Sequence, residues 1–517
     1  MWEPLTNAYN TVAGWFRRGI GSMTDAVAHN KPAWPPEAER ERLHRYERNT
    51  RLYLGEHKEV FATSAYGFHY TYDAARDYVT ANLTGALTDT LIWRLFGEGL
   101  EVQGPEEDEA TQAFLDSVYE DSSLDTQLLT AGAAASYLGD AWLKVRYDAE
   151  ERRVLVEPVS AALVYPEFAP LNAGRMVAAV IAQVLLGRSG GKRVDYLWQE
   201  RHELREGRAW ITNRLYRLHG DEKSGYRFDP NEDAVDLATL EATAELPEEQ
   251  DTGVDGLLLL HVPNRGSVRS PFWGTSDYEG LLELQGELNH RRTQRGEVLD
   301  KFVDPFMWGP TLDDESIAHL REHKYFETEP GAASPVGMLV WDAQLAAVVE
   351  ELRDLTEQFA TAAGIEAEAL LPPEGGAPQS GRAIRLSQYK TGARVLAKQR
   401  YWGPALKQAL ALATQLANAP GVVVETRPQV VSPKAIILRW NDGLPSDDRE
   451  ETETLALQVE VGLNSRLAAL KTLHQLTEAD AQARLAQIRE EENLAAPPAP
   501  EGLGLLENVQ PLAPGGE

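Results

Sequence analysis

The most constraining feature of this 517-residue sequence is a long stretch without acidic residues. Between Glu374 and Glu425 there is no Asp or Glu but there are seven Lys and Arg, although the formal net charge of the chain is −30. The helical part of this stretch follows an amphipathic helix predicted at about residues 342–363 and a loop rich in Pro and Gly, LLPPEGGAPQSG. The sequence therefore predicts a helix, a loop extended between two helices, and then a long basic helix.

Three of the basic residues, Lys390, Arg394 and Lys398, stand four residues apart and form one stripe on that helix. One interpretation of the stripe is a solvated face, or a partner for acidic groups of a neighbouring subunit. The other is direct contact with DNA phosphates. The loop also has two interpretations, as an ordinary connector or as a mobile element exposed in a channel.

Composition limits the class of protein. The length suffices for roughly three domains, and 43% hydrophobic residues suffice for packed cores. The balance of 80 Asp and Glu against 50 Lys and Arg argues against a protein that coats nucleic acid through a basic exterior. The absence of Cys excludes disulfides, thiolate catalysis and Cys-based zinc sites. The N-terminus is a poor secretory signal and no apolar run approaches ~20 residues, so we expect no membrane partner.

The pattern of hydrophobic residues predicts an α+β fold. Helical periodicity occurs at about residues 37–55, 73–95 and 108–139, and alternating strand-like runs follow from Ala141 to about Leu218. Ten acidic residues and no Lys or Arg lie between Arg227 and Arg265. We interpret residues 228–264 as a solvated loop or insertion, with a cation site as the alternative, although the acids lack the spacing of a calcium loop.

The second half of the chain alternates long helices with short modules. A strand, GLLLLHVPN, leads to a helix at about 277–300 that Ser276 or Asp277 is predicted to cap. A small mixed segment, Lys301 to Trp341, separates it from the helix at 342–363. After the basic helix, GVVVETRP and KAIILRW are predicted strands. Helical segments broken near Gly462 and Ser465 then run to Glu492, and the Pro- and Gly-rich end is predicted to be disordered.

Motifs for catalysis are absent from the sequence. There is no HExxH, GxxxxGK[ST], GxGxxG or GxSxG. Paired carboxylates are frequent in any acidic chain and identify no site. We therefore predict no catalytic residue, no metal site, no cofactor and no enzyme activity.

Several segments, taken in order, resemble the portal proteins of tailed bacteriophages, in the family with a C-terminal helical crown. The resemblance extends over about residues 37–492 and rests on GDAWLKVRYD followed by VLVEPVSAALVYPE, on HVPN and GTSDYEGLLELQGELN, on QSGRAIRL after the loop, and on VEVGLNSRLAALKTL with LTEADAQARLAQIREEE near the end.

This resemblance implies a portal fold with an α/β wing, stem helices, an α/β clip, a tunnel loop and a crown. The expected parts are an N-terminal arm (1–36), the wing (37–265, completed by 420–445), a stem helix (266–300), the clip (301–341), a second stem helix (342–363), the tunnel loop (364–381), the long basic helix (382–419), the crown (446–492) and a disordered tail (493–517).

The resemblance also implies a function and partners. Portal proteins form a homo-oligomeric ring, usually of about twelve subunits, at one capsid vertex of the virion. The large terminase subunit drives double-stranded DNA through the ring, and the DNA later leaves through it. Further implied partners are the major capsid, scaffolding and head-completion or adaptor proteins, and assembly takes place in the host cytoplasm. The alternatives are a soluble acidic enzyme, such as a hydrolase, or another oligomeric virion component.

The resemblance assigns residues to three sites. The channel-facing tunnel loop would contain Leu370, Leu371, Pro372, Pro373, Glu374, Gly375, Gly376 and Gln379. The loop also holds Glu366 and Glu368 but no Lys or Arg, so we expect steric rather than ionic contact with DNA. The basic helix near the channel or a subunit junction would contribute Arg382, Arg385, Lys390, Arg394 and Lys398. The clip would present Asp313, Asp314, Glu315, Arg321 and Lys324 to the terminase or the adaptor.

Overall fold

The computed structural model describes residues 31–68, 70, 78–106, 108–189, 192–221, 225–303, 306–310, 325–328, 337–339, 345–371, 388–441, 448–474 and 478–495. The chain divides into two compact units. The first comprises residues 1–377 and 385–443, and the second comprises residues 378–384 and 444–517.

The first unit contains a group of helices, most of which the sequence predicts. They are α2 (Arg40–Tyr53), α3 (His57–Phe61), α4 (Leu83–Phe96), α5 (Glu109–Asp121), α6 (Leu124–Leu138) and α11 (Tyr389–Ala417). Side chains cap two of them: Asn82 accepts a hydrogen bond from the Gly85 amide, and Asp108 accepts one from the Thr111 amide. The predicted helix at 108–139 is two helices, because Ser123 adopts a left-handed conformation with φ +50° between them.

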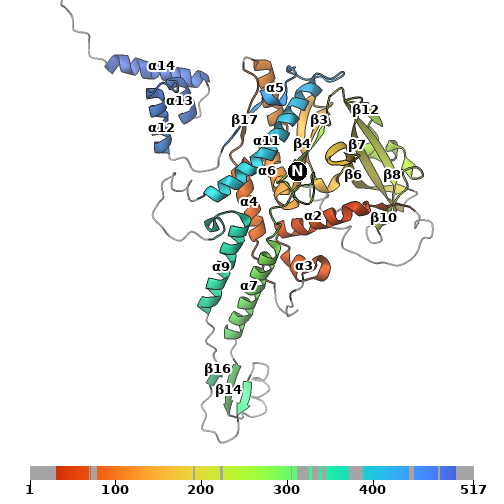
Figure 1. The fold of residues 1–517 in the computed structure, drawn as a ribbon, viewed down its shortest axis with the longest axis vertical. Coiled ribbons are helices and arrows are strands. Elements are labelled where there is room, and N and C mark those ends of the chain that lie inside the picture. Colours follow the sequence, from red (N-terminus) through yellow and green to blue (C-terminus); the bar gives the residue numbers. More distant parts are fainter. Residues whose placement is uncertain are drawn as a thin grey trace, which may run out of the picture. The chain divides into compact units, whose positions relative to one another are not determined.

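A six-stranded antiparallel sheet forms most of the strand content (Figure 1). Its strands are β5 (Val164–Ala169), β6 (Asn172–Ser189), β7 (Lys192–Arg205), β8 (Arg208–Arg217), β11 (Ala234–Val235) and β12 (Glu249–Asp251). The order is β11-β8-β7-β6-β5, and β12 also pairs with β8. Both β11 and β12 lie in the acidic segment 228–264, so our interpretation of that whole segment as a solvated loop is wrong. Three of its carboxylates, those of Glu249, Asp251 and Glu248, approach Arg side chains at the end of β7, at the start of β8 and within β8, respectively.

The first unit also contains two three-stranded antiparallel sheets formed by neighbouring parts of the chain. One has the order β13 (Leu259–Pro263), β3 (Asp140–Asp148), β4 (Arg153–Val159). The other has the order β1 (Ala33–Trp34), β10 (Gly225–Arg227), β9 (His219–Asp221). Trp34 is buried and its ring lies 4.8 Å from that of Tyr165, between ring centroids. The end of the predicted N-terminal arm is therefore fixed to the first unit.

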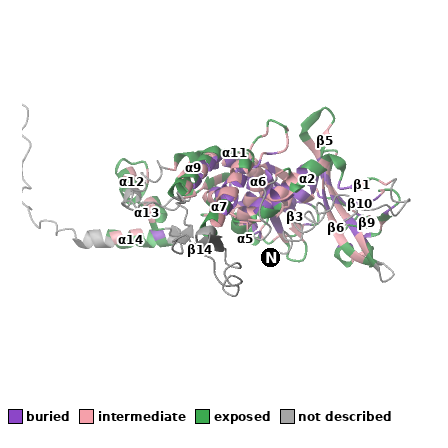
Figure 2. Ribbon diagram, turned by 90° about the horizontal axis from the view of Figure 1, so that it is seen from below, coloured by how far each residue is buried: buried purple, intermediate pink, exposed green. Residues whose placement is uncertain are grey.

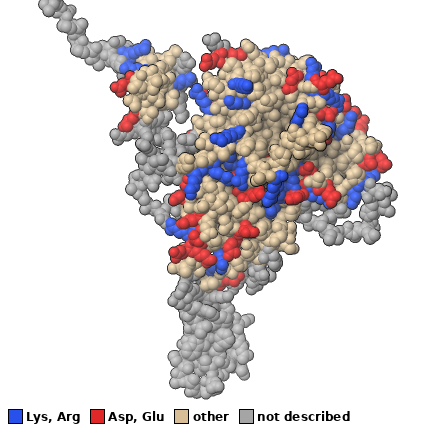
Figure 3. Space-filling view, in the orientation of Figure 1, with Lys and Arg blue, Asp and Glu red and all other residues tan. Residues whose placement is uncertain are grey.

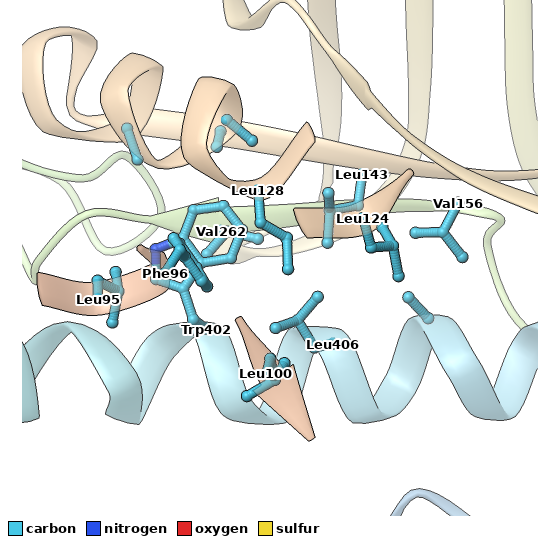
Figure 4. Packing of buried hydrophobic residues seen from close by; sticks show 14 of the residues in the cluster. Leu95, Phe96, Leu100, Leu124, Leu128, Leu143, Val156, Val262, Trp402 and Leu406 are labelled. Atoms are coloured by element: carbon cyan, nitrogen blue, oxygen red, sulfur yellow. The ribbon is translucent and has the colours of Figure 1, made fainter. Parts of the chain in front are cut away.

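The main core lies where α11 crosses α4, α6 and the β3–β4 sheet. Trp402 has no exposed area, and its ring meets that of Phe96 edge to face at 5.1 Å. Figure 4 shows Trp402 and Leu406 of α11 packed with Phe96 and Leu128, and buried residues concentrate in the same helices in Figure 2. Gly132 is needed at one close approach, because an added Cβ would lie 3.0 Å from the Phe96 ring. Helix α11 is thus packed into the core along its C-terminal two thirds.

Two helices, α7 (Leu282–Val303) and α9 (Leu345–Ala363), run side by side (Figure 1), and the side chains of Arg291 and Glu351 approach to 3.2 Å between them. Between them in sequence, β14 (Phe306–Pro310) pairs in parallel with β15 (Tyr325–Thr328) and antiparallel with β16 (Gly337–Leu339). The sequence pattern predicts short extended pieces around FETEPG and VGMLVW, which β15 and β16 confirm, but it does not predict β14. The same pattern predicts a small helix near Asp313 to His323, which lies outside the described residues.

A two-stranded antiparallel sheet joins distant parts of the first unit. Strand β17 (Ile437–Trp440) pairs with β2 (Leu100–Gln103), from Ile437 opposite Gln103 to Trp440 opposite Leu100. The predicted strand KAIILRW is confirmed. The other predicted strand, GVVVETRP at 421–428, is wrong: the segment forms no ladder, although Val422 is buried and Tyr147 hydrogen-bonds the Val423 backbone. Val422 and Val424 pack on the core without a partner strand, whereas Val423 is 54% exposed.

The second unit consists of α12 (Asp448–Glu460), α13 (Arg466–His474) and α14 (Glu478–Ala495). Gly462, with φ +75°, stands between α12 and α13 where the sequence predicts a break. Among the side chains described at 452–474 and 480–489, only Ala481 is buried (Figure 2). Leu457, Val461 and Leu463 are all more than half exposed. This unit buries little hydrophobic surface of its own.

Candidate functional site

The turn from α9 to α11 contains most of the residues that the sequence assigns to a channel. Leu370 and Leu371 are half-buried at the end of the described part of the loop. Pro372, Pro373, Glu374, Gly375, Gly376, Gln379, Arg382 and Arg385 lie outside the described residues. The five clip residues Asp313, Asp314, Glu315, Arg321 and Lys324 also lie outside them. These assignments stay predictions.

Glu366, which follows α9, joins the two ends of this segment because its side chain contacts the start of α11. Its carboxylate accepts hydrogen bonds from the backbone amides of Lys390 at 2.6 Å and Thr391 at 3.1 Å, and from the Thr391 hydroxyl. It thereby satisfies amides in the first turn of α11 and places negative charge at the positive end of the helix dipole. Burial acts to raise the pKa of Glu366, but these hydrogen bonds outweigh it and lower the pKa. These hydrogen bonds hold the two ends of the segment between Glu366 and Lys390 against each other.

The stripe of Lys390, Arg394 and Lys398 does not act as one surface. Lys398 is 4% exposed, and its ammonium lies 2.5 Å from Oδ2 of Asp277 and donates to Oδ1 of Asn264. Arg394 donates to the other carboxylate oxygen of Asp277 at 3.2 Å. Lys390 is exposed. The interpretation of a solvated stripe is therefore wrong for Lys398, whose charge is neutralised within the subunit.

Asp277 is the centre of this buried cluster. It is 2% exposed, and besides the two cations it accepts a hydrogen bond from Ser136 Oγ at 2.8 Å. Burial acts to raise its pKa, but the charges of Lys398 and Arg394 outweigh burial and lower the pKa. Burial lowers the pKa of Lys398, and Asp277 opposes that shift. The cluster ties α11 to the segment that leads into α7.

The role predicted for Ser276 or Asp277 as helix cap is wrong, because α7 begins five residues later at Leu282. Ser276 instead accepts from the Tyr278 amide. Asp277 and Glu366 are the positions at which sequence reasoning missed a role, since their partners lie 121 and 24–25 residues away. In the sequence, Asp277 is an acidic residue just before a predicted helix, and nothing near it indicates a cationic partner far along the chain.

Helix α9 carries a line of exposed carboxylates. Glu350, Asp354 and Glu357 recur every three to four residues, on the side opposite the buried Leu352 and Phe359. Figure 3 shows Asp and Glu side chains gathered over α9. Ion pairs of this helix include Arg353 with Glu357 at 3.1 Å and Glu351 with Arg291 of α7 at 3.2 Å. This face would repel a polyanion.

A polar cluster between β3 and β7 is buried and does not form an accessible reaction site. Lys144 Nζ lies 2.5 Å from Oε1 of Glu200, and His202 Nε2 lies 2.6 Å from the same atom. Burial acts to raise the pKa of Glu200, but the His202 hydrogen bond and the Lys144 charge lower it to about 2. Glu200 and His202 are 6% and 1% exposed, so a substrate has no access to them.

Within the described ranges, no group of three or more carboxylate and imidazole side chains is placed to hold a metal ion. Among the same residues, no helix has both the length and the apolar content needed to cross a membrane.

Comparison with known proteins gives one family. The family described as phage portal protein, SPP1 Gp6-like, matches residues 36–497. No curated protein matches the chain. Two similar solved structures are a chain of the neck of the native GTA particle, computed with C12 symmetry, and a chain of the neck of the empty GTA particle, computed with C6 symmetry. The first is 12% identical, covering 75% of this chain and 90% of that one with a TM-score of 0.37. The second is 12% identical, covering 87% and 98% with a TM-score of 0.42.

Proposed function

This chain belongs to the SPP1 Gp6-like family of phage portal proteins, and from that premise we propose that it passes double-stranded DNA into and out of the capsid. The family is structural rather than enzymatic, and its members form homo-oligomeric rings at the portal vertex of the virion. The family match, which spans nearly the whole chain, carries the proposal. The finer parts of the function below are inferred from the residues.

The parts of the portal are proposed as the sequence indicates them. Residues 37–265 with 420–445 form the wing, 266–300 and 342–363 the stem, and 301–341 the clip, which contacts the large terminase subunit and later an adaptor. Residues 364–381 form the tunnel loop, 382–419 the long helix behind it, and 446–492 the crown. The packed pair α7 and α9 around the β14–β16 sheet supports the stem and clip, and the exposed α12–α14 unit supports a crown that needs neighbouring subunits.

The channel is proposed to repel DNA rather than to bind it. A ring repeats each charged side chain once per subunit, so the exposed carboxylates of α9 become a band of negative charge if they face the lumen. Such a band prevents phosphates from adhering while the motor moves DNA. The tunnel loop, which has no Lys or Arg, supplies steric contact, and its fixed base at Glu366 allows the tip to shift without releasing α11.

The test is the mass of the purified protein, measured by light scattering, with negative-stain images of the same peak. A ring of about twelve 57.3-kDa subunits has a mass of roughly 0.7 MDa. We expect that mass and ring-shaped particles with a central channel. A monomer or dimer that persists across protein and salt concentrations, and in the presence of scaffolding protein, would contradict the proposal.

A further inference from the structure

Helix α11 has a second face that lies opposite the Asp277 cluster. Tyr389, Ala393, Leu396 and Arg400 stand at intervals of four, three and four residues, which places them on one side of the helix. All four are exposed, Tyr389 at 75% and Leu396 at 62%. Lys398 lies two residues from both Leu396 and Arg400 and therefore points the other way. We call these four residues the outer face of α11.

The outer face lies on a helix whose opposite side is buried. Opposite the outer face, α11 buries Val395 and Lys398, which are 6% and 4% exposed, and Lys398 belongs to the Asp277 cluster. An exposed Tyr and an exposed Leu two turns apart form an apolar strip along this helix, with Ala393 between them. Contiguous exposed apolar surface rimmed by polar residues is typical of contacts with other proteins.

The composition of the outer face fits a protein partner better than DNA. Tyr and Arg are enriched at the energetic centres of protein interfaces, and the small Ala393 lets a partner approach the helix closely. A DNA-binding face relies on several Lys and Arg per contact region, whereas this face has Arg400 with Lys390 beside it. No acid occurs from residue 375 to 424, so the partner surface must supply the carboxylates.

We propose that the outer face of α11 docks on an acidic surface of the neighbouring copy of this chain. The inference rests on the ring architecture of the proposed function. In a ring the contact is heterologous, meaning that the outer face of one subunit meets a different face of the next. A chain with a net charge of −30 offers acidic surface for this purpose, and each docked copy neutralises part of the repulsion between subunits.

The experiment compares ring assembly of the wild type with the full-length variants Leu396→Glu and Tyr389→Glu. Both sites are exposed in the monomer, so folding is expected to survive, and Glu suits a helix. The matched control is Val268→Glu, which places the same charge at another fully exposed apolar residue. Light scattering over a concentration series gives the concentration at which half the protein is in rings, and thermal unfolding of the monomer reports folding.

We expect each α11 variant to need at least about tenfold more protein for assembly, since the substitution removes a central apolar contact and adds a repelling charge. Val268→Glu is expected to assemble as the wild type does. Assembly of the α11 variants at wild-type concentrations overturns the inference, as does equal loss of assembly in the control. Normal rings that fail to retain DNA assign the face to DNA instead and also overturn it.

Two further outcomes are distinguishable. A wild type that never forms rings contradicts the proposed function itself, whatever the variants do. If a Glu variant lowers the unfolding temperature of the monomer, Leu396→Ala decides by the same assembly criterion, because it keeps the helix and removes only the apolar contact.

Discussion

Replacing Asp277 by Asn is expected to destabilise the first unit strongly. The Asn side chain keeps the size of Asp277 but leaves Lys398, 4% exposed, with its charge buried and without a carboxylate. Removing one partner of a buried ion pair costs on the order of 3–5 kcal/mol, because the remaining charge stays desolvated. Arg394 retains partial access to solvent, with a quarter of its side chain exposed, and adds less to the cost.

The assay is the unfolding temperature, measured by calorimetry at fixed protein concentration. An unfolding entropy of about 2 cal/mol/K per residue over a unit of about 400 residues converts 3–5 kcal/mol to a fall of roughly 4–6 °C. The control is the double variant Asp277→Asn with Lys398→Met, which removes both charges and is expected to recover most of the loss. A single-variant shift below about 1 °C, or a double variant no more stable than the single one, would refute the assignment of a coupled buried pair.

Three other perturbations test separate features. Glu200→Gln removes a carboxylate whose pKa is lowered to about 2, so the stabilisation from its charge is present above about pH 4.5 and is lost as the pH falls towards 2. The difference in unfolding temperature between the variant and the wild type should therefore be largest at pH 6 and shrink by pH 3. A difference that stays constant with pH would contradict this reasoning. Trp402→Ala should lower the free energy of unfolding by about 3–5 kcal/mol, because it opens a cavity in the core. Trp93→Ala, at a site 58% exposed, should lower it by less than about 1 kcal/mol. Similar losses for the two variants would show that Trp402 does not lie in the core. Deletion of residues 374–378 should leave ring mass unchanged in light scattering and reduce DNA retention in packaged heads, whereas loss of folding would show that the loop is structural.

The local patterns of the sequence predict the main helices well. The spacing of Leu345, Val348, Leu352, Leu355 and Phe359 predicts α9, and the acid-free stretch predicts α11, because both patterns have the helical period over several turns. The order of two helices around a small strand-containing module is also evident from the sequence. These features depend on residues close together in the chain.

The features that the sequence does not predict depend on distant partners. GVVVETRP has the composition of a strand but has no neighbouring strand, while β2, which the sequence pattern does not predict, forms a ladder with residues more than three hundred positions away. Lys398 is spaced from Lys390 and Arg394 as a member of a surface stripe would be. It is nevertheless buried in the folded chain, because Asp277 lies against it. Periodicity identifies the faces of α11 but cannot say which one meets the core.

The pairing of β2 with β17 sets a condition on synthesis of the chain. The first unit is not complete until Ile437–Trp440 has left the ribosome, although its partner Leu100–Gln103 emerges more than three hundred residues earlier. Helix α11, which fills the main core, also arrives late. During translation, α4, α5 and α6 therefore wait with apolar surface uncovered, and chaperones have a long interval in which to bind them. Truncation after residue 443 preserves this closure, whereas truncation before Ile437 leaves a nascent chain that cannot finish its own core.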